Sequence, residues 1–135
     1  MKNFEFHNPT KIVFGADTVS KLSALVPHDA RVLILYGGAS AEKTGTLAEV
    51  RAALAVGQRS VQEFGGIEPN PSYETLMRAV AQVRNEKLDF LLAVGGGSVI
   101  DGTKFVAAAA LYDGEPWEIA ERGGANVQRA LPFGT

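Results

Sequence analysis

A run of apolar residues that ends in three consecutive glycines constrains this chain more than any other feature of its sequence. Residues 90–94 show no polar alternation, which is typical of a strand covered on both faces of a parallel sheet. Gly95, Gly96 and Gly97 follow directly, and a segment with helical character begins at Ser98. Glycine has no Cβ atom, so the turn can be tight and its N–H groups can approach a ligand closely. Because a helix N-terminus attracts anions, this order of elements predicts a site for a phosphate or pyrophosphate group.

The turn matches neither of two common phosphate-binding patterns in full. Ile100 stands where the dinucleotide fingerprint has its third glycine, and Thr103 precedes Lys104, whereas a P-loop has the lysine first. The glycines could instead allow the strand and the helix to pack closely. Three in a row lose more backbone entropy than packing usually requires, which favours the phosphate site.

Polar residues after the turn have two interpretations each. Ser98 and Asp101 are spaced as in a capping box at a helix N-terminus. Asp101 and Lys104 are spaced as an i, i+3 ion pair. Alternatively, the lysine is a cation beside a phosphate-bearing ligand. A structural role and a ligand-binding role can also hold for the same residue at once.

Strands and helices alternate along the rest of the chain. Helices are predicted at residues 17–26, 46–56, 72–86 and 98–111, with a helical turn near 117–121, and further strands at 32–36 and 60–64. Such alternation requires right-handed crossovers, which predicts an α/β, Rossmann-like fold with a mostly parallel sheet. The predicted strands end in glycine-rich turns at one edge of that sheet, where ligands of open α/β folds bind.

The beginning of the chain predicts a different element. Two short apolar or alternating runs flank the turn-like residues Asn8-Pro9-Thr10. Residues 3–14 are therefore expected to form a two-stranded β-hairpin.

Two further turns provide candidate ligand contacts. Gly37, Gly38 and Ser40 follow the strand at 32–36, and no acidic residue stands where one would bond the ribose 2′-hydroxyl of NAD. This favours NADP, although an ordinary turn would look similar. Asn70 lies in the next turn, and Pro71 is expected to hold it extended. Its amide could face a ligand or bond its own backbone.

Composition excludes several other functions. The 135 residues carry a net charge of −2 without basic clusters, so neither nucleic acid nor an anionic membrane is expected as a partner. The absence of cysteine removes disulfides and thiolate metal sites. His7 and His28 are not spaced as metal ligands, and no catalytic set can be assembled. With no signal peptide or membrane-spanning run, a cytoplasmic protein is expected.

The last residues indicate an unfinished sheet. Residues 130–135 resemble the entry to a further strand, and only three or four strands are predicted, which is few for this fold. We therefore expect residues 1–135 to form one incomplete nucleotide-binding domain of a longer protein. Its exposed edge and apolar faces predict self-association.

Three motifs in order resemble the iron-containing (group III) alcohol dehydrogenase family, above all its NADPH-dependent aldehyde reductases and butanol dehydrogenases. The motifs are residues 36–40, 64–71 and 95–104. The resemblance implies a cofactor domain followed by an all-helical domain, which is absent here and which holds iron or zinc through one aspartate and three histidines. It also implies the cofactor NADP(H) and a small aldehyde or alcohol as substrate. A homo-oligomer is expected from the exposed sheet edge rather than from the resemblance.

The resemblance also assigns roles to residues of this chain. The pyrophosphate group would be held by Gly95, Gly96, Gly97 and Ser98, and the acidic and basic positions after them are Asp101 and Lys104. Gly37 stands where NAD-preferring members have an aspartate. Gly38, Ser40 and Asn70 would line the adenosine side. No catalytic residue or metal ligand can be carried over, so this chain alone is expected to be inactive.

Two other functions remain open from the sequence. One is a fragment of an enzyme like dehydroquinate synthase or glycerol-1-phosphate dehydrogenase, which share the glycine turn but not the segment at 68–71 or the amino-terminal run. The other is a nucleotide-binding module without catalysis.

Overall fold

A single sheet of four parallel strands forms the centre of the molecule. The computed structural model describes residues 3–135. Strand β1 (Arg31–Tyr36) lies between β2 (Ser60–Phe64) and β3 (Phe90–Val94), and the short β4 (Phe133–Gly134) pairs with β3. The strand order is β2-β1-β3-β4, so the predicted α/β fold with parallel strands is confirmed.

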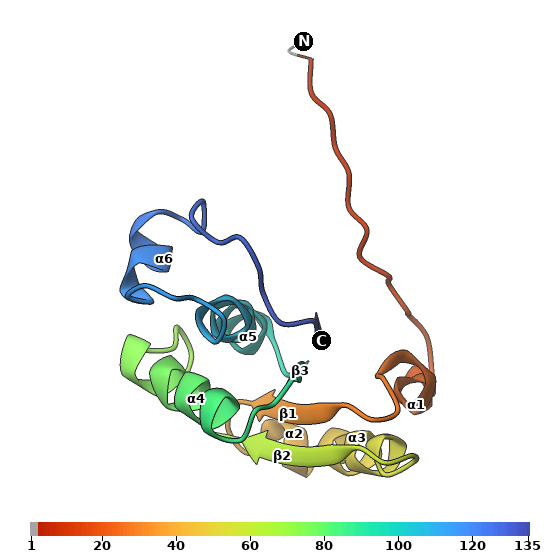
Figure 1. Ribbon diagram of the computed structural model, residues 1–135. Coiled ribbons are helices and arrows are strands. Elements are labelled where there is room, and N and C mark those ends of the chain that lie inside the picture. Colours follow the sequence, from red (N-terminus) through yellow and green to blue (C-terminus); the bar gives the residue numbers. More distant parts are fainter. Residues whose placement is uncertain (1–2) are drawn as a thin grey trace.

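Helices cover both faces of this sheet (Figure 1). They are the 3₁₀ helix η1 (Thr18–Lys21) and the α-helices α1 (Leu22–Leu25), α2 (Ser40–Lys43), α3 (Thr46–Leu54), α4 (Tyr73–Asn85), α5 (Gly97–Ala109) and α6 (Trp117–Glu121). In β1, Leu33 and Leu35 pack in the core under α4 and α5, whereas Val32 and Ile34 pack in the core under α1 and α3. Because the central strands are buried on both faces, they show no polar alternation.

Most predicted elements are confirmed, several with small shifts at their ends. The strands at 60–64 and 90–94 have the predicted bounds, and β1 begins one residue early. Helix α4 is capped as expected, because the Ser72 hydroxyl accepts a hydrogen bond of 3.2 Å from the N–H of Thr75. The segment at 17–26 is a 3₁₀ turn followed by a short α-helix, and the short helix α2 was not predicted.

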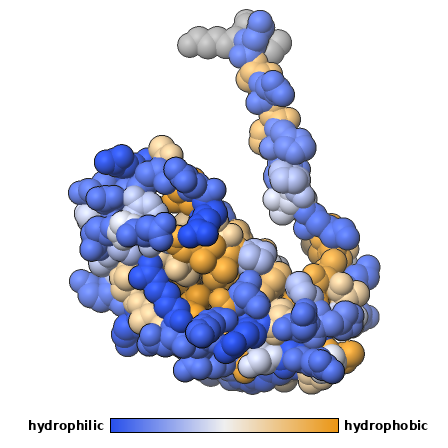
Figure 2. All heavy atoms as spheres, viewed as in Figure 1, coloured by the Kyte–Doolittle hydropathy of each residue, from blue (hydrophilic) through white to orange (hydrophobic). Residues whose placement is uncertain are grey.

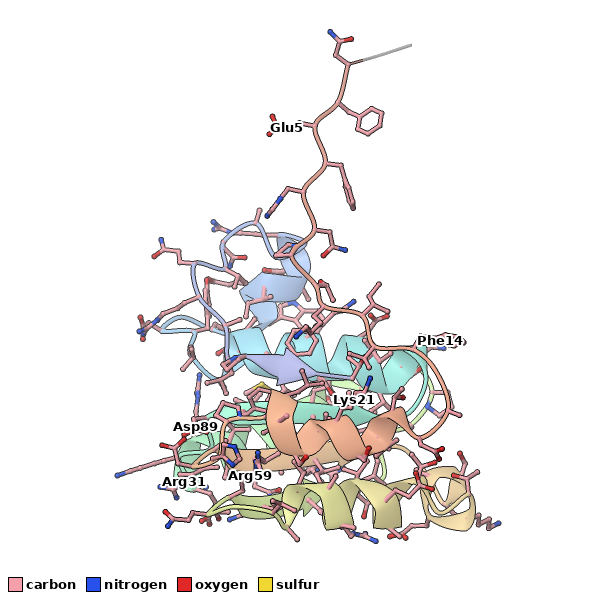
Figure 3. The ribbon with its side chains drawn as sticks, turned by 90° about the vertical axis from the view of Figure 1, so that its right-hand side faces the viewer. Glu5, Phe14, Lys21, Arg31, Arg59 and Asp89 are labelled. Atoms are coloured by element: carbon pink, nitrogen blue, oxygen red, sulfur yellow. The ribbon has the colours of Figure 1, made fainter. Side chains whose placement is uncertain are left out.

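The predicted hairpin is wrong. Residues 3–14 form no strand and run as an extended arm away from the body of the molecule (Figures 1 and 3). Apolar and polar residues alternate along the arm (Figure 2), and Phe4 and Phe14 are 84% and 97% exposed. A two-stranded hairpin is marginal in water unless one face packs on other structure. The arm has no such contact with the sheet, so its alternation does not produce a hairpin.

The amino ends of the strands are closed by the chain's own polar groups. The N–H of Arg31 donates to Asp89 Oδ1 at 2.8 Å, and the Arg31 guanidinium donates to the carbonyl of Glu86. At the same rim the Arg59 guanidinium donates to the carbonyls that end α1, including that of Ser23 at 2.7 Å (Figure 3). The opposite rim, at the carboxyl ends of the strands, holds the glycine turns. Within residues 3–135, no helix is long and apolar enough to cross a membrane.

Candidate cofactor site

Glycine turns follow β1, β2 and β3 at the carboxyl rim of the sheet. The turn after β2 runs beside the end of β1, because the N–H of Gly66 donates to the Gly37 carbonyl at 2.9 Å and that of Ile67 to the Tyr36 carbonyl at 3.2 Å. The turn after β3 lies at the same rim, since β1 and β3 are neighbouring parallel strands. The structure therefore gathers these turns on one face, as the strand pattern predicted.

The glycines of this rim fall into two groups. A Cβ atom at Gly65 would lie 2.6 Å from the Tyr36 ring, and one at Gly95 would lie 2.7 Å from Val99 Cγ2, so these two glycines are needed for packing. A Cβ atom at Gly38, Gly96 or Gly97 would meet nothing within 4 Å. At those three positions the protein exposes bare main chain to open space, which a ligand can approach closely.

Helix α5 begins inside this open region. Its N-cap residue is Gly96, no side chain caps it, and its first turn holds no acidic residue. The first N–H groups of a helix have no intrahelical acceptor, so those of Gly97 and Ser98 are available to an anion. The capping-box interpretation of Ser98 and Asp101 is wrong, because the helix starts before Ser98.

Helix α4 at the same rim shows the contrasting arrangement. The Glu68 carboxylate accepts the N–H of Ser72 at 2.9 Å and the hydroxyl of Thr75 at 3.0 Å. The bond from the Ser72 N–H is the main reason that the pKa of Glu68 falls to about 2. The positive end of α4 is thus occupied by the chain's own carboxylate, whereas that of α5 is left open.

Two predicted site residues from different turns are joined. The N–H of Asn70 donates to Ser98 Oγ at 3.2 Å. Asn70 has φ 50°, in the left-handed region, so the extended conformation expected for it is wrong. Pro71 disfavours the right-handed helical region for the preceding residue, and asparagine tolerates the left-handed one. The bond to Ser98 and the Glu68 carboxylate hold the loop in this conformation.

The remaining predicted site residues lie on exposed parts of α2 and α5. Ser40 is the first residue of α2, directly after the turn at Gly37 and Gly38. Lys104 Nζ lies 3.4 Å from Asp101 Oδ1, and both side chains are more than half exposed. The ion-pair interpretation of Asp101 and Lys104 therefore agrees with the structure, and such a surface pair stabilises a fold only slightly.

A charged cluster beside the turn after β1 was not anticipated from the sequence. The Arg51 guanidinium on α3 bridges Glu42 on α2 and Glu63 on β2, with nitrogen–oxygen distances of 2.7 Å to each carboxylate. Hydrogen bonds from Arg51 are the main reason that the pKa values of Glu42 and Glu63 are lowered. The three residues lie nine and twelve positions apart on separate elements, so only the tertiary fold reveals the cluster.

No metal centre can be built from the part of the chain that the structure describes. Within residues 3–135, no three histidine, cysteine, aspartate or glutamate side chains gather where they could hold a metal ion. We assign no metal ligand to this chain.

Comparison with known proteins agrees with this geometry. A family model described as iron-containing alcohol dehydrogenase matches residues 9–135. The NADPH-dependent aldehyde reductase YqhD of Escherichia coli is 57% identical over 136 residues, covering 99% of this chain. A probable NADH-dependent butanol dehydrogenase of Bacillus subtilis is 45% identical over 136 residues, covering the whole chain. The solved substrate- and cofactor-free structure of E. coli YqhD superposes on 98% of this chain with a TM-score of 0.93 at 56% identity.

These relatives are much longer than the chain. It spans 35% of the length of both sequence relatives and 35% of the YqhD structure. Their names divide between NADPH and NADH, so the relatives leave the cofactor preference of this chain open.

Proposed function

This chain belongs to the iron-containing alcohol dehydrogenase family, and on that premise we propose that it forms the NADP(H)-binding part of an enzyme that interconverts aldehydes and primary alcohols. The observation that carries the proposal is the open N-terminus of α5. There the bare main chain of Gly96 and Gly97 faces free space at the carboxyl rim of the sheet. Ligands of open parallel sheets bind at this rim.

The pyrophosphate group of the cofactor would lie against the turn after β3. The N–H groups of Gly97 and Ser98 would donate to its oxygens, with Gly96 leaving room for them. Gly95 contributes by packing against Val99, which fixes the direction in which the turn leaves the strand. Lys104, paired with Asp101 one turn along α5, would add positive charge on the same helix.

The adenosine end would lie against the turn after β1. In doubly wound nucleotide folds, the strand beside the phosphate-binding strand carries the acidic residue that bonds the ribose. Here that strand is β1, and it is followed by Gly37, whose Cβ atom would lie only 3.2 Å from the Ile67 carbonyl oxygen. A longer side chain is therefore crowded at this position. The turn after β1, with Gly38 and Ser40, would then leave space for the 2′-phosphate of NADP, and Asn70 from the turn after β2 would line the same subsite.

The bound cofactor supplies the hydride, and the residues of this chain hold and orient it. The described residues offer no cluster for the iron that the family name implies, so no step involving a metal is assigned to them. The substrate, the homo-oligomeric state and the domain boundary at residues 1–135 remain parts of this proposal.

Cofactor binding can be tested with a substitution that fills the open space. We expect the wild-type chain to change the fluorescence of NADPH on titration, and Gly97→Leu to raise the Kd at least about tenfold. A Cβ atom at this position meets no protein atom within 4 Å, so we expect the variant to fold while its side chain excludes the pyrophosphate.

The matched control is Ala81→Leu, which places the same side chain on the exposed face of α4. Its Kd should equal that of the wild type, and thermal melting should show all three proteins folded. Wild-type affinity in folded Gly97→Leu would refute the assigned position of the pyrophosphate.

A further inference from the structure

The cluster of Arg51, Glu42 and Glu63 joins three elements around the turn after β1. Nη1 and Nη2 of Arg51 donate to the two oxygens of Glu42 at 3.2 and 2.7 Å, and Nε and Nη2 donate to those of Glu63 at 2.7 and 2.9 Å. Both contacts are bidentate, which gives a defined geometry as well as attraction. The side chains are only 30–47% exposed, so solvent screens them less than free surface ions.

This cluster lies next to the proposed adenosine subsite. Glu42 is two residues beyond Ser40 on the short helix α2, which continues directly from Gly38. Glu63 precedes the turn in which Gly65 packs under the Tyr36 ring. Burial, and then the nearby charge of Glu63, raise the pKa of Tyr36, the last residue of β1. The two carboxylates thus lie together near the end of β1, since both bind the same guanidinium.

The charges of the cluster bear on which cofactor can bind. Glu42 and Glu63 together carry two negative charges, and Arg51 cancels one of them. Lys43, on α2, is a further cation near the turn, and it is exposed. The 2′-phosphate of NADPH carries a charge of about −2, whereas the 2′-hydroxyl of NADH is neutral and can donate to a carboxylate. Two uncompensated carboxylates here would repel NADPH and leave NADH unaffected.

Building on the proposed function, we propose that Arg51 is a cofactor-specificity residue: by holding Glu42 and Glu63 in one ion-pair network, it lets the turn after β1 accept the 2′-phosphate. All its donors described above point to the two carboxylates, so Arg51 acts through them and is a positioning residue. The network also ties α2, and with it Ser40, to the edge of the sheet.

The test compares Arg51→Gln with the wild-type chain in titrations with NADPH and NADH. We expect the Kd for NADPH to rise about tenfold, equivalent to ~1.4 kcal/mol, and the Kd for NADH to stay within about twofold. The rise should shrink in ~0.5 M NaCl, because salt screens the repulsion between the carboxylates and the phosphate. Lys87→Gln is the matched control, since it removes one positive charge at the amino rim, and its NADPH affinity should be unchanged.

A triple variant separates charge from shape. Glu42→Gln, Arg51→Gln and Glu63→Gln together remove all three charges, and we expect this protein to regain most of the NADPH affinity. If the triple variant is as weak as Arg51→Gln, or if Arg51→Gln weakens NADPH and NADH equally, the inference is wrong. If the wild-type chain binds NADPH but not NADH, the two cofactors cannot be compared. In that case the recovery of NADPH affinity in the triple variant tests the inference. Binding of neither cofactor by the folded wild type would overturn the proposed function itself, and the inference with it.

Discussion

At the scale of single residues, Glu68 shows how one carboxylate can fix a loop at the rim. It accepts the N–H of Ser72, just before α4, and the hydroxyl of Thr75 within α4, and the loop that it closes places the backbone N–H of Asn70 on Ser98. The same residue type at the N-terminus of α5 would occupy the space that we assign to a phosphate. The two helices therefore differ in their capping: the Ser72 hydroxyl and the Glu68 carboxylate occupy the N-terminus of α4, whereas no side chain caps α5.

The lowered pKa of Glu68 gives a prediction for acid unfolding. Its pKa is about 2 in the folded chain, below the ordinary value of 4.5, so its stabilising contribution is complete above pH 4.5 and is lost as the pH falls toward 2. We expect Glu68→Gln to lower the free energy of unfolding at pH 7 and to flatten its decline across this pH window. Urea unfolding at several pH values measures both effects.

The exposed Glu121 on α6 provides the control for this prediction. Glu121→Gln should leave the acid-dependent decline as in the wild type. Equal pH profiles for Glu68→Gln and the wild type would show that the carboxylate does not stabilise the loop.

At the scale of elements, the strand–turn–helix unit from β3 to α5 contains glycines with opposite roles. Gly95→Ala would place a Cβ atom 2.7 Å from Val99 Cγ2, and we expect this overpacking to destabilise the protein by about 1–3 kcal/mol. Gly97→Ala meets no neighbour and lies in the helix, so it should be neutral or stabilising by up to ~1 kcal/mol. Denaturant unfolding of the two variants measures the difference.

A second substitution checks the cause of that difference. Because Val99 is the residue that a Cβ atom at position 95 would strike, Val99→Ala should cost less in the Gly95→Ala background than in the wild type. Additive effects of the two substitutions would contradict the packing explanation.

The sequence was sufficient to predict elements whose signal is local. The strands and α4 follow from apolar periodicity and from the Ser72 cap, which act within a few residues. The arm at 3–14 has the alternation of apolar and polar residues that is typical of a hairpin. Whether a hairpin forms there depends on a surface for it to pack on, which the alternation does not reveal. Asn70 takes its left-handed conformation partly through a bond to Ser98, a residue 28 positions away. The Arg51 cluster likewise depends on how α2, α3 and β2 meet in space.

At the scale of the whole molecule, the two rims of the sheet are built differently. Arg31, Asp89 and Arg59 satisfy the backbone groups of the amino rim, whereas the carboxyl rim presents uncapped main chain at α5. The amino rim of the sheet is thus closed by the chain's own side chains, whereas main-chain groups at the carboxyl rim are open to a ligand. This asymmetry supports the placement of all proposed cofactor contacts on one face.

The exposed arm predicts how the isolated chain behaves in solution. Phe4, Phe6 and Phe14 are 84%, 79% and 97% exposed, and burying such side chains is favourable. We expect the chain to self-associate, and the variant Phe4→Ser, Phe6→Ser, Phe14→Ser to shift toward the monomer in sedimentation velocity. Val56→Ser, which removes an exposed apolar side chain on the body, should have no such effect. A monomeric wild-type chain would contradict this expectation.

The bare main chain at Gly38, Gly96 and Gly97 has a consequence for inheritance. The proposed cofactor contacts here use main-chain atoms, and the space beside them is open. A mutation that adds a side chain at one of these glycines can therefore abolish cofactor binding without disturbing the fold. Cellular quality control acts on unfolded chains, so under the proposed function such alleles would escape degradation and accumulate as folded protein that does not bind the cofactor.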